Sequence, residues 1–347
     1  MRRAPIRPPI MPRDAASQRR LRFALPRPVP PGLWRRVPPA VFPPVLGALG
    51  LALAWLGGVR AFALPPGLAQ LLAGMVVAVA LFALLAYGVK LARRPGVLAE
   101  ELAILPGRAG VAAGVLSLYL LAAVVGAIAS VGLGRVLLVG SLVLHVVFLA
   151  VLVGVFRRGP AEQRRVTPAF HLSFTGFIVA ARAALVLGWP GLAAGLFWPA
   201  MIAALVIYAV SVRQLRAAGV PAPLRPMLVI HLAPLALFAT VSVDLGWTTA
   251  GTALAWATLM LLAVLILRAR WLLADGFSPL WGALTFPVAA TAAAWVGLWT
   301  AAPSEPNRII AGALLVGATL VVVPILLLVL RAWAQGRLPV RTNAAIA

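Results

Sequence analysis

The sequence predicts an all-α polytopic membrane protein, in which ten transmembrane helices form five helical hairpins. Two observations predict this class. Of the 347 residues, 63% are hydrophobic and only 11% are charged, and the mean hydropathy is +1.03, which is more apolar surface than a water-soluble domain needs. The apolar residues also fall into ten separate segments of about 20 residues, the length that a helix needs to cross a bilayer.

Residues 1–39 precede the first apolar segment. They are rich in Arg and Pro and contain no long apolar run, and therefore no signal-peptide core. A segment of this composition buries too little apolar surface to fold by itself. We expect a disordered basic tail on the cytoplasmic face, which contributes to membrane topology.

The ten apolar segments occupy residues 40–334, which we assign as a transmembrane channel domain. Very short connections, such as 132–135 and 189–190, join neighbouring segments as antiparallel pairs, which gives five hairpins. Residues 335–347 remain as a cytoplasmic C-terminal tail. The approximate bounds of the segments are Val41–Gly58, Leu68–Leu91, Arg108–Val131, Val136–Phe156, Ala169–Gly188, Gly191–Val212, Pro226–Val243, Thr248–Leu267, Pro279–Thr300 and Ile309–Trp333.

The basic residues orient the segments. With the N-terminus inside, only Arg60, Arg135 and Arg308 fall in outer loops and only Arg182 falls inside a segment; every other Lys and Arg lies on the inner side. Because cytoplasmic loops are enriched in Lys and Arg, both termini are predicted to be cytoplasmic. The formal net charge of +23 is therefore attributed to topology and to contact with anionic lipid of the bilayer, and no nucleic-acid binding is predicted.

Prolines and small residues mark the odd-numbered segments. Pro43 and Pro44 lie in the first, Pro168 begins the fifth, Pro234 lies in the seventh and Pro287 in the ninth. A proline inside a helix removes a backbone hydrogen bond and kinks the helix, and within a bilayer the freed carbonyl must face protein or a water-filled cavity. The odd segments are also rich in Gly and Ala, which either permit close helix packing or leave a lumen open. The five prolines are thus candidate kinks that line a path.

The stretch Phe277–Ala290, which reads FSPLWGALTFPVAA, combines these features. Ser278 and Pro279 are typical of a helix start, and Pro287 interrupts the same helix eight positions later, next to Phe286. A Phe in an apolar helix ordinarily packs in the core or faces lipid. Beside a proline kink it can also constrict a pore, which a hydrophobic ring closes by excluding water. Phe286 is the candidate pore gate.

Chemistry that needs sulfur or acidic side chains has little support. The chain has no Cys, and none of its seven Asp and Glu falls in the middle of a segment. This excludes disulfides and thiolate chemistry, and argues against paired catalytic carboxylates and a carboxylate proton relay in the membrane. We predict no enzymatic activity, no cofactor and no metal site. Glu100 and Glu101 lie in a basic inner loop, where we expect them to pair with Arg93 or Arg94.

Four polar residues inside the segments are further candidates. Arg182, about two-thirds along the fifth segment, either extends to the outer interface or supplies positive potential to an anion path. His145 is midway along the fourth segment, and we expect a buried hydrogen-bonding role. His171 and His231 stand near the cytoplasmic ends of the fifth and seventh segments and are candidates for an inner vestibule, although two separated His are weak support for a metal or proton site.

Several motifs resemble one known family. Residues 277–281 (FSPLW) followed by 285–287 (TFP) resemble the ninth-helix motif of the tellurite-resistance/dicarboxylate-transporter family, which includes the plant guard-cell slow anion channels. Weaker likenesses occur at 167–170 (TPAF) with Gly176, at 231–234 (HLAP), and at Tyr87, Lys90 and Glu101. The family often has two Trp where this chain has Leu280 and Trp281, which limits any transfer of substrate preference.

The resemblance implies ten helices in five hairpins, with the odd-numbered helices around a pore in each protomer of a homotrimer. It implies that a Phe of the ninth helix, here Phe286, occludes that pore. The family is associated with anion conduction, four-carbon dicarboxylate uptake, sulfite export and tellurite resistance. We therefore expect an anion channel or facilitator of the bacterial inner membrane, with small inorganic or organic anions as partners. The alternative is a secondary carrier for dicarboxylate, tellurite or sulfite. An enzyme or signalling scaffold is disfavoured, because the sequence offers no nucleophile–base pair and no soluble effector domain.

Overall fold

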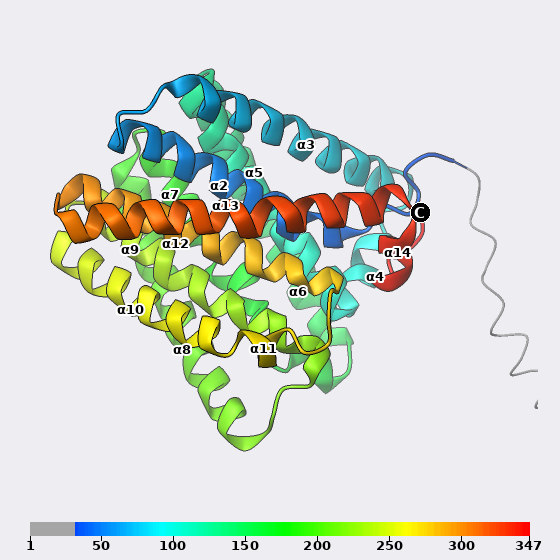
Figure 1. Cartoon of the computed structure of the whole chain (residues 1–347). Helices are drawn as coiled ribbons and strands as arrows, with labels where there is room; N and C mark the ends of the chain where they lie inside the picture. Colours follow the sequence, from blue (N-terminus) through cyan, green and yellow to red (C-terminus); the bar gives the residue numbers. More distant parts are fainter. Residues whose placement is uncertain (1–31) are drawn as a thin grey trace, which may run out of the picture. The chain divides into compact units, whose positions relative to one another are not determined.

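The computed structural model describes residues 32–347, so most of the predicted basic tail lies outside the described residues. Residues Trp34–Ala347 form one compact unit (Figure 1). Every regular element in the described part of the chain is a helix. The predicted class, an all-α polytopic membrane protein, is confirmed.

Nine of the ten predicted segments are helices that are long and apolar enough to cross a membrane, counted over the described residues. The fifth is shorter: a π-helical turn, η3 (His171–Thr175), leads into α7 (Phe177–Val186). Three of the long helices directly continue a 3₁₀-helical turn. The long helices are α2 (Phe42–Ala61), α3 (Pro66–Arg93), α5 (Leu105–Ile128), α6 (Val131–Arg158), α8 (Pro190–Ala217), α9 (Leu232–Asp244, continuing η4, Ala222–His231), α10 (Thr248–Leu267), α12 (Gly282–Ala301, continuing η5, Pro279–Trp281) and α13 (Glu305–Ala334).

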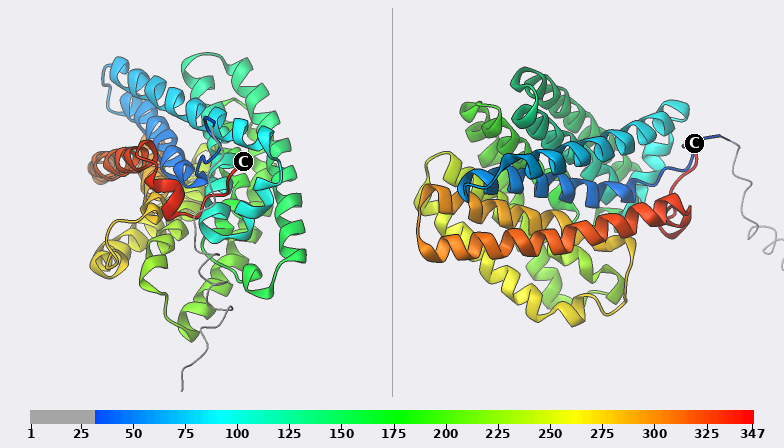
Figure 2. Two further views of the ribbon diagram at one scale, coloured as in Figure 1. Left: turned by 90° about the vertical axis from the view of Figure 1, so that its right-hand side faces the viewer. Right: turned by 45° about the horizontal axis from the view of Figure 1, so that its top comes forward.

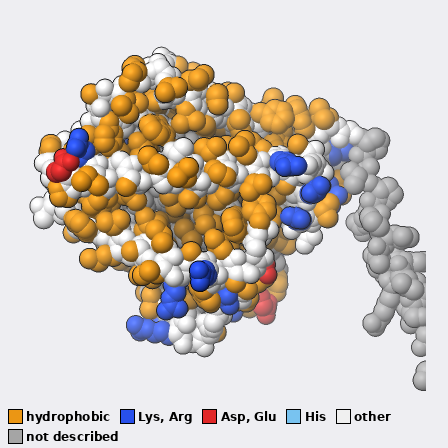
Figure 3. All heavy atoms as spheres, in the orientation of Figure 1, with side chains coloured by type: hydrophobic (Ala, Val, Ile, Leu, Met, Phe, Trp, Pro, Cys, Tyr) orange, Lys and Arg blue, Asp and Glu red, His pale blue; other side chains and the backbone are white. Residues whose placement is uncertain are grey.

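Odd-numbered and even-numbered segments occupy different layers (Figure 2). In the odd segments with a long helix, between 61% and 89% of the most apolar stretch is buried, whereas in the five even segments the share is only 22% to 28%. The even helices α3, α6, α8, α10 and α13 therefore form an outer layer, and the odd helices form the core. Figure 3 shows one outer face on which hydrophobic side chains dominate, while Lys and Arg gather along its right-hand and lower edges.

Small residues bring the inner helices together, as the sequence suggested. A Cβ atom added to Gly47 of α2 would lie 2.8 Å from the backbone carbon of Thr285 in α12, so only glycine permits this approach. The Thr285 hydroxyl donates a hydrogen bond to the carbonyl oxygen of Pro43 at 3.0 Å. Helices α2 and α12 are thus in close contact near their N-terminal ends.

The shortness of the fifth segment has a local cause. Its wide π-helical turn ends at Gly176, where an added Cβ would lie 2.6 Å from Leu116 Cδ2 and 3.0 Å from His145 Cε1. A π-helical turn is a rare conformation that persists only where the surroundings support it. Here α5 and α6 pack against the turn and leave no room for a side chain.

The connection between α3 and α5 is fixed by ion pairs. The short helix α4 (Val97–Ala103) places the Glu101 carboxylate against Lys90 and the Tyr87 hydroxyl, with the Lys90 and Glu101 side chains fully buried. Glu100 pairs with Arg94 at the surface, as predicted. The expectation that Glu101 would also pair with an arginine was wrong, because α4 turns Glu101 inward and Glu100 outward.

The C-terminal segment is packed against the bundle. It forms the short helix α14 (Arg337–Arg341), in which Leu338 and Pro339 are buried. The backbone N–H of Ala347 donates to the Arg35 carbonyl oxygen at 2.9 Å, and the Arg35 guanidinium donates to the Ala347 carbonyl oxygen at 3.0 Å. Residues 335–347, taken from the sequence as a tail, therefore meet the start of the first inner segment.

Candidate functional site

One cavity lies where the first turns of all five inner segments meet, beside the C-terminal segment. We call it the proximal cavity; its volume is about 220 Å³. Its wall is largely apolar, with Arg341 as its charged residue among those described. The lining residues are Ala40, Pro43, Pro106, Ala109, Leu172, Pro223, Met227, Ile230, Ser278, Pro279, Leu280, Ala283, Arg341 and Thr342.

A second cavity lies farther along the same inner helices. This distal cavity has a volume of about 320 Å³ and is lined by α2, α7, α9 and α12. Arg60, Arg182 and Asp244 are its charged residues. Small residues such as Gly57 and Gly297 make up much of the rest of the wall, which leaves space between the helices.

Arg182 and Asp244 form an ion pair across the distal cavity wall, between α7 and α9. Their side chains are 24% and 27% exposed, so both remain partly accessible to solvent. The sequence pointed to Arg182 but not to its partner, because the two residues are 62 positions apart and Asp244 is the last residue of its helix. Arg60 adds a second guanidinium group to this cavity.

Phe286 lies on α12 between the residues that line the two cavities, and its neighbour on α2, Gly50, lies between the cavity-lining residues of that helix. On α12 the proximal cavity reaches Ala283 and the distal cavity begins at Ala293, which at 1.5 Å per residue is a separation of about 15 Å. The Phe286 side chain is 5% exposed. It packs over Gly50 of α2, because a Cβ added to Gly50 would lie 3.1 Å from Phe286 Cδ2. The ring therefore lies within the stretch of core that separates the cavities.

The five predicted kink prolines differ in position. Pro43 and Pro44 stand in the first turn of α2, where a helix tolerates proline without losing a hydrogen bond. Pro168 precedes the π-helical turn, and Pro234 is the third residue of α9. Pro287 lies inside α12. The residue whose carbonyl it leaves without a helical donor, Ala283, lines the proximal cavity.

The structure brings the two predicted vestibule histidines together. His171 Nε2 lies 3.0 Å from His231 Nδ1, and His171 Nδ1 lies 3.2 Å from Thr175 Oγ1. The Tyr208 hydroxyl donates to the His231 carbonyl oxygen at 2.5 Å. Both rings are buried at the junction of η3 and η4, beside the proximal cavity and not in its wall.

His145 has the structural role that its position predicts. Its side chain is fully buried, with Nδ1 2.9 Å from the Tyr119 hydroxyl and Nε2 2.8 Å from the Ser173 carbonyl oxygen. It thereby ties α5 and α6 to the π-helical turn. In the part of the chain that the structure describes, no group of three or more His, Asp or Glu is placed to hold a metal ion.

Comparison with models of protein families gives a match over most of the chain. The family model described as SLAC1: voltage-dependent anion channel matches residues 36–330, which includes all the inner and outer helices almost to the end of α13. No curated protein matches the chain.

Proposed function

Because the chain belongs to the SLAC1 family of voltage-dependent anion channels, we propose that its inner helices line a path for anions, which the Phe286 ring closes. Family membership gives an anion channel or transporter function and a multi-pass membrane protein. The family is one of channels and transporters, not of enzymes. Beyond family membership, we propose which residue forms the gate, which helices line the path and what kind of anion passes.

The position of Phe286 carries the proposal. Two cavities approach each other along α2 and α12, and the ring stands in the interval between them. A wide cavity on each side of one apolar side chain is the arrangement expected of a hydrophobic constriction. Rotation of the ring away from Gly50 would remove this obstruction from the interval between the proximal and distal cavities.

The charges of the cavities favour anions. Arg341 borders the proximal cavity, and Arg60 and Arg182 border the distal cavity against the single carboxylate of Asp244. Because these charges lie at the cavity walls and not at the Phe286 constriction, they raise the local concentration of anions without binding them tightly. We therefore propose weak selectivity among small anions.

The orientation in the membrane is part of the proposal. The proximal cavity faces the cytoplasm and the distal cavity faces outward, in a bacterial inner membrane with both termini cytoplasmic, which is supported by the distribution of Lys and Arg along the chain. Residues 40–334 act as the channel domain. The resemblance to the family supports a homotrimer in which each protomer has its own path.

Chloride and nitrate currents in planar bilayers test the gate. We expect Phe286→Ala to give a large current that reverses near the anion equilibrium potential, while the wild type gives little. Phe238→Ala is the matched control: this Phe is 1% exposed on inner helix α9 and packs edge-to-face on Phe197 of outer helix α8, away from both cavities. Equal currents from the wild type and from folded Phe286→Ala would place the constriction elsewhere. Silence from both would reject the gate.

A secondary carrier is the second candidate function, and the ionisable groups beside the cavities favour it. Asp244 and Arg182 border the distal cavity, and the His171–His231 pair lies next to the proximal cavity. Such groups can couple the movement of a dicarboxylate, sulfite or tellurite to that of a proton. Counterflow of labelled substrate in vesicles, which a carrier shows and a channel does not, distinguishes the two.

A further inference from the structure

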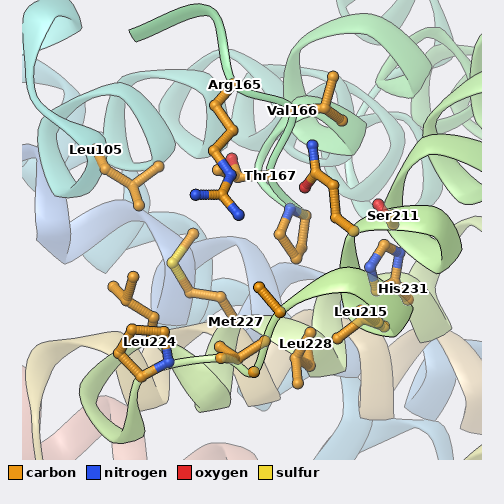
Figure 4. Close-up of a pocket in the computed structure, with 16 residues that line it drawn as sticks. Leu105, Arg165, Val166, Thr167, Ser211, Leu215, Leu224, Met227, Leu228 and His231 are labelled. Carbon is orange, nitrogen blue, oxygen red and sulfur yellow. The ribbon is translucent and has the colours of Figure 1, made fainter. Parts of the chain in front are cut away.

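A third cavity lies on the flank of the seventh segment, outside the proposed path. We call it the lateral cavity; its volume is about 290 Å³. It is bordered by the linker 165–168, the last turns of α8 and the irregular turn η4, and it is partly open to the surroundings (Figure 4). Met227 lines both this cavity and the proximal cavity, and the other lining residues differ. The two cavities are therefore neighbours.

Three of the residues that line this cavity each carry a buried polar atom without a protein partner. These atoms are His231 Nε2, Ser211 Oγ and Thr167 Oγ1, each fully shielded. His231 is 9% exposed and Ser211 7% exposed. Nine buried side-chain atoms in the described residues lack a partner, and three of the nine line this one cavity. Because an unpaired buried polar atom is costly, their convergence indicates a bound molecule that satisfies them.

The second nitrogen of His231 is already occupied. Its Nδ1 lies 3.0 Å from His171 Nε2, and the far nitrogen of His171 lies 3.2 Å from Thr175 Oγ1. When the proton of His171 is on Nε2, His171 donates to His231, and His231 must then carry its own proton on Nε2. In that tautomer, His231, which is one of the residues that line the lateral cavity, carries an N–H donor that no protein group accepts.

The remaining wall defines the chemical class of the ligand. Arg165 is the charged residue of this wall among the described residues, and Figure 4 shows its guanidinium projecting from the linker into the cavity. Thr167, Ser211 and Gln214 supply hydroxyl and amide groups. The rest is apolar, with Leu105, Val166, Leu215, Leu224 and Leu228 among the lining residues. A cationic group and several donors at a mostly apolar cavity are suited to an anionic head group on an apolar body.

We propose that the lateral cavity binds a small organic anion, with a carboxylate or phosphate head group held by Arg165, Ser211 and His231 and a compact apolar body among the leucines. The molecule is either a soluble metabolite or the head-group region of an anionic lipid. This site does not depend on Phe286 or on the proposed path.

Isothermal titration of the full-length protein with benzoate and with benzamide tests the site. The two probes share an apolar ring and differ in head-group charge. We expect benzoate to bind and benzamide to bind at least tenfold more weakly. Arg165→Gln should weaken benzoate about tenfold or more, because a hydrogen bond to a charged group is lost. Ser211→Ala should weaken it severalfold.

Matched controls separate the site from general effects. Arg164→Gln removes the neighbouring exposed arginine, which does not line the cavity. Ser242→Ala removes another buried hydroxyl without a partner, on α9 and away from the cavity. Both should keep the wild-type affinity. Arg165 is exposed, so Arg165→Gln stays informative even if Ser211→Ala does not fold.

The lipid source is tested by reconstituting the wild type in phosphatidylcholine discs with and without phosphatidate. Loss of benzoate binding when phosphatidate is present would identify a lipid head group as the occupant, and unchanged binding would identify a soluble anion. The proposal is overturned if benzoate does not bind in phosphatidylcholine discs, if benzamide binds as tightly, or if Arg165→Gln and Arg164→Gln behave alike.

Discussion

The buried Lys90–Glu101 pair gives a stability prediction whose size can be worked from the structure. The Lys90 ammonium contacts the Glu101 carboxylate and donates to the Val37 carbonyl oxygen at 2.7 Å, and the Tyr87 hydroxyl donates to the same carboxylate. Both charged side chains are 0% exposed. Glu101→Gln removes one charge and leaves the other buried without its counter-ion, which costs about 3–5 kcal/mol.

The adjacent pair is a built-in control. Glu100 and Arg94 also form an ion pair, but their side chains are 53% and 43% exposed. An exposed pair contributes little, because water and salt screen it. We therefore expect Glu100→Gln to leave the thermal midpoint of the purified protein nearly unchanged. At about 2 °C per kcal/mol, the same measurement should show a loss of roughly 6–10 °C for Glu101→Gln.

Two results would refute this reasoning. If Glu100→Gln and Glu101→Gln lower the midpoint equally, burial does not decide the contribution of either pair. The double variant Lys90→Met/Glu101→Leu removes both charges and should regain most of the loss, since apolar replacement of a complete buried pair is often neutral or stabilising. A double variant as unstable as the sum of its single variants would show that the charges act independently.

The other predictions concern the path and its supports. In the Phe286→Ala background, Gly50→Val should reduce the anion current by more than half, because the new side chain enters the space that the ring occupied; Gly74→Val on the outer helix α3, where an added Cβ meets nothing within 4 Å, should not. Asp244→Asn should shift the reversal potential toward greater anion selectivity, and Arg182→Gln should shift it the opposite way. Gly176→Ala should lower the thermal midpoint by several degrees, as overpacking costs about 1–3 kcal/mol, whereas Gly74→Ala should leave it unchanged. Hydrogen bonds from Arg94 hold the pKa of Glu100 below its usual value, so the small stabilisation from this carboxylate is present above the unfolded-state pKa and is lost as the pH falls through the lower folded-state value; wild type and Glu100→Gln should therefore have the same midpoint in strong acid.

The sequence predicted the features that depend on local composition. Apolar runs gave the long helices within a few residues, and the contrast between Gly- and Ala-rich odd segments and bulkier even segments corresponds to the inner and outer layers. The prediction was weaker where two distant residues meet. Arg182 with Asp244, and His171 with His231, are about 60 positions apart, and no single-sequence pattern links them. The partner of Glu101 is close in the sequence but was also not predicted, because it depends on how the short helix α4 is rotated.

The effect of individual prolines was also hard to predict from the sequence. Pro43 and Pro287 read alike in the sequence, since both stand in apolar segments, yet one belongs to the first turn of its helix and the other to the interior. The effect of a proline depends on where its helix begins, and that boundary is the least certain part of a sequence-based assignment. The distinction needs the hydrogen bonds of the folded chain.

The irregular starts of the inner segments explain why this fold needs two layers. The outer helices α3, α6 and α8 run for 28 residues each and α13 for 30, without a break in their helical assignment. Four of the five inner segments instead begin with a 3₁₀ or π-helical turn, namely η1 (Pro39–Val41), η3, η4 and η5.

Residues of all four turns line the proximal cavity: Ala40, Leu172, Ile230 and Pro279 are examples. Backbone that departs from the α-helix cannot face lipid, because its polar groups would lack partners, but it can border a cavity inside the protein. The prolines at these starts favour such turns, and the continuous outer helices separate them from the lipid. On this argument, the outer layer is what allows the inner segments to place irregular backbone around the proximal cavity. Helices α3 and α6 contain no internal proline, so a proline that breaks either of them midway should impair folding of the protein more than one added to the first turn of α2.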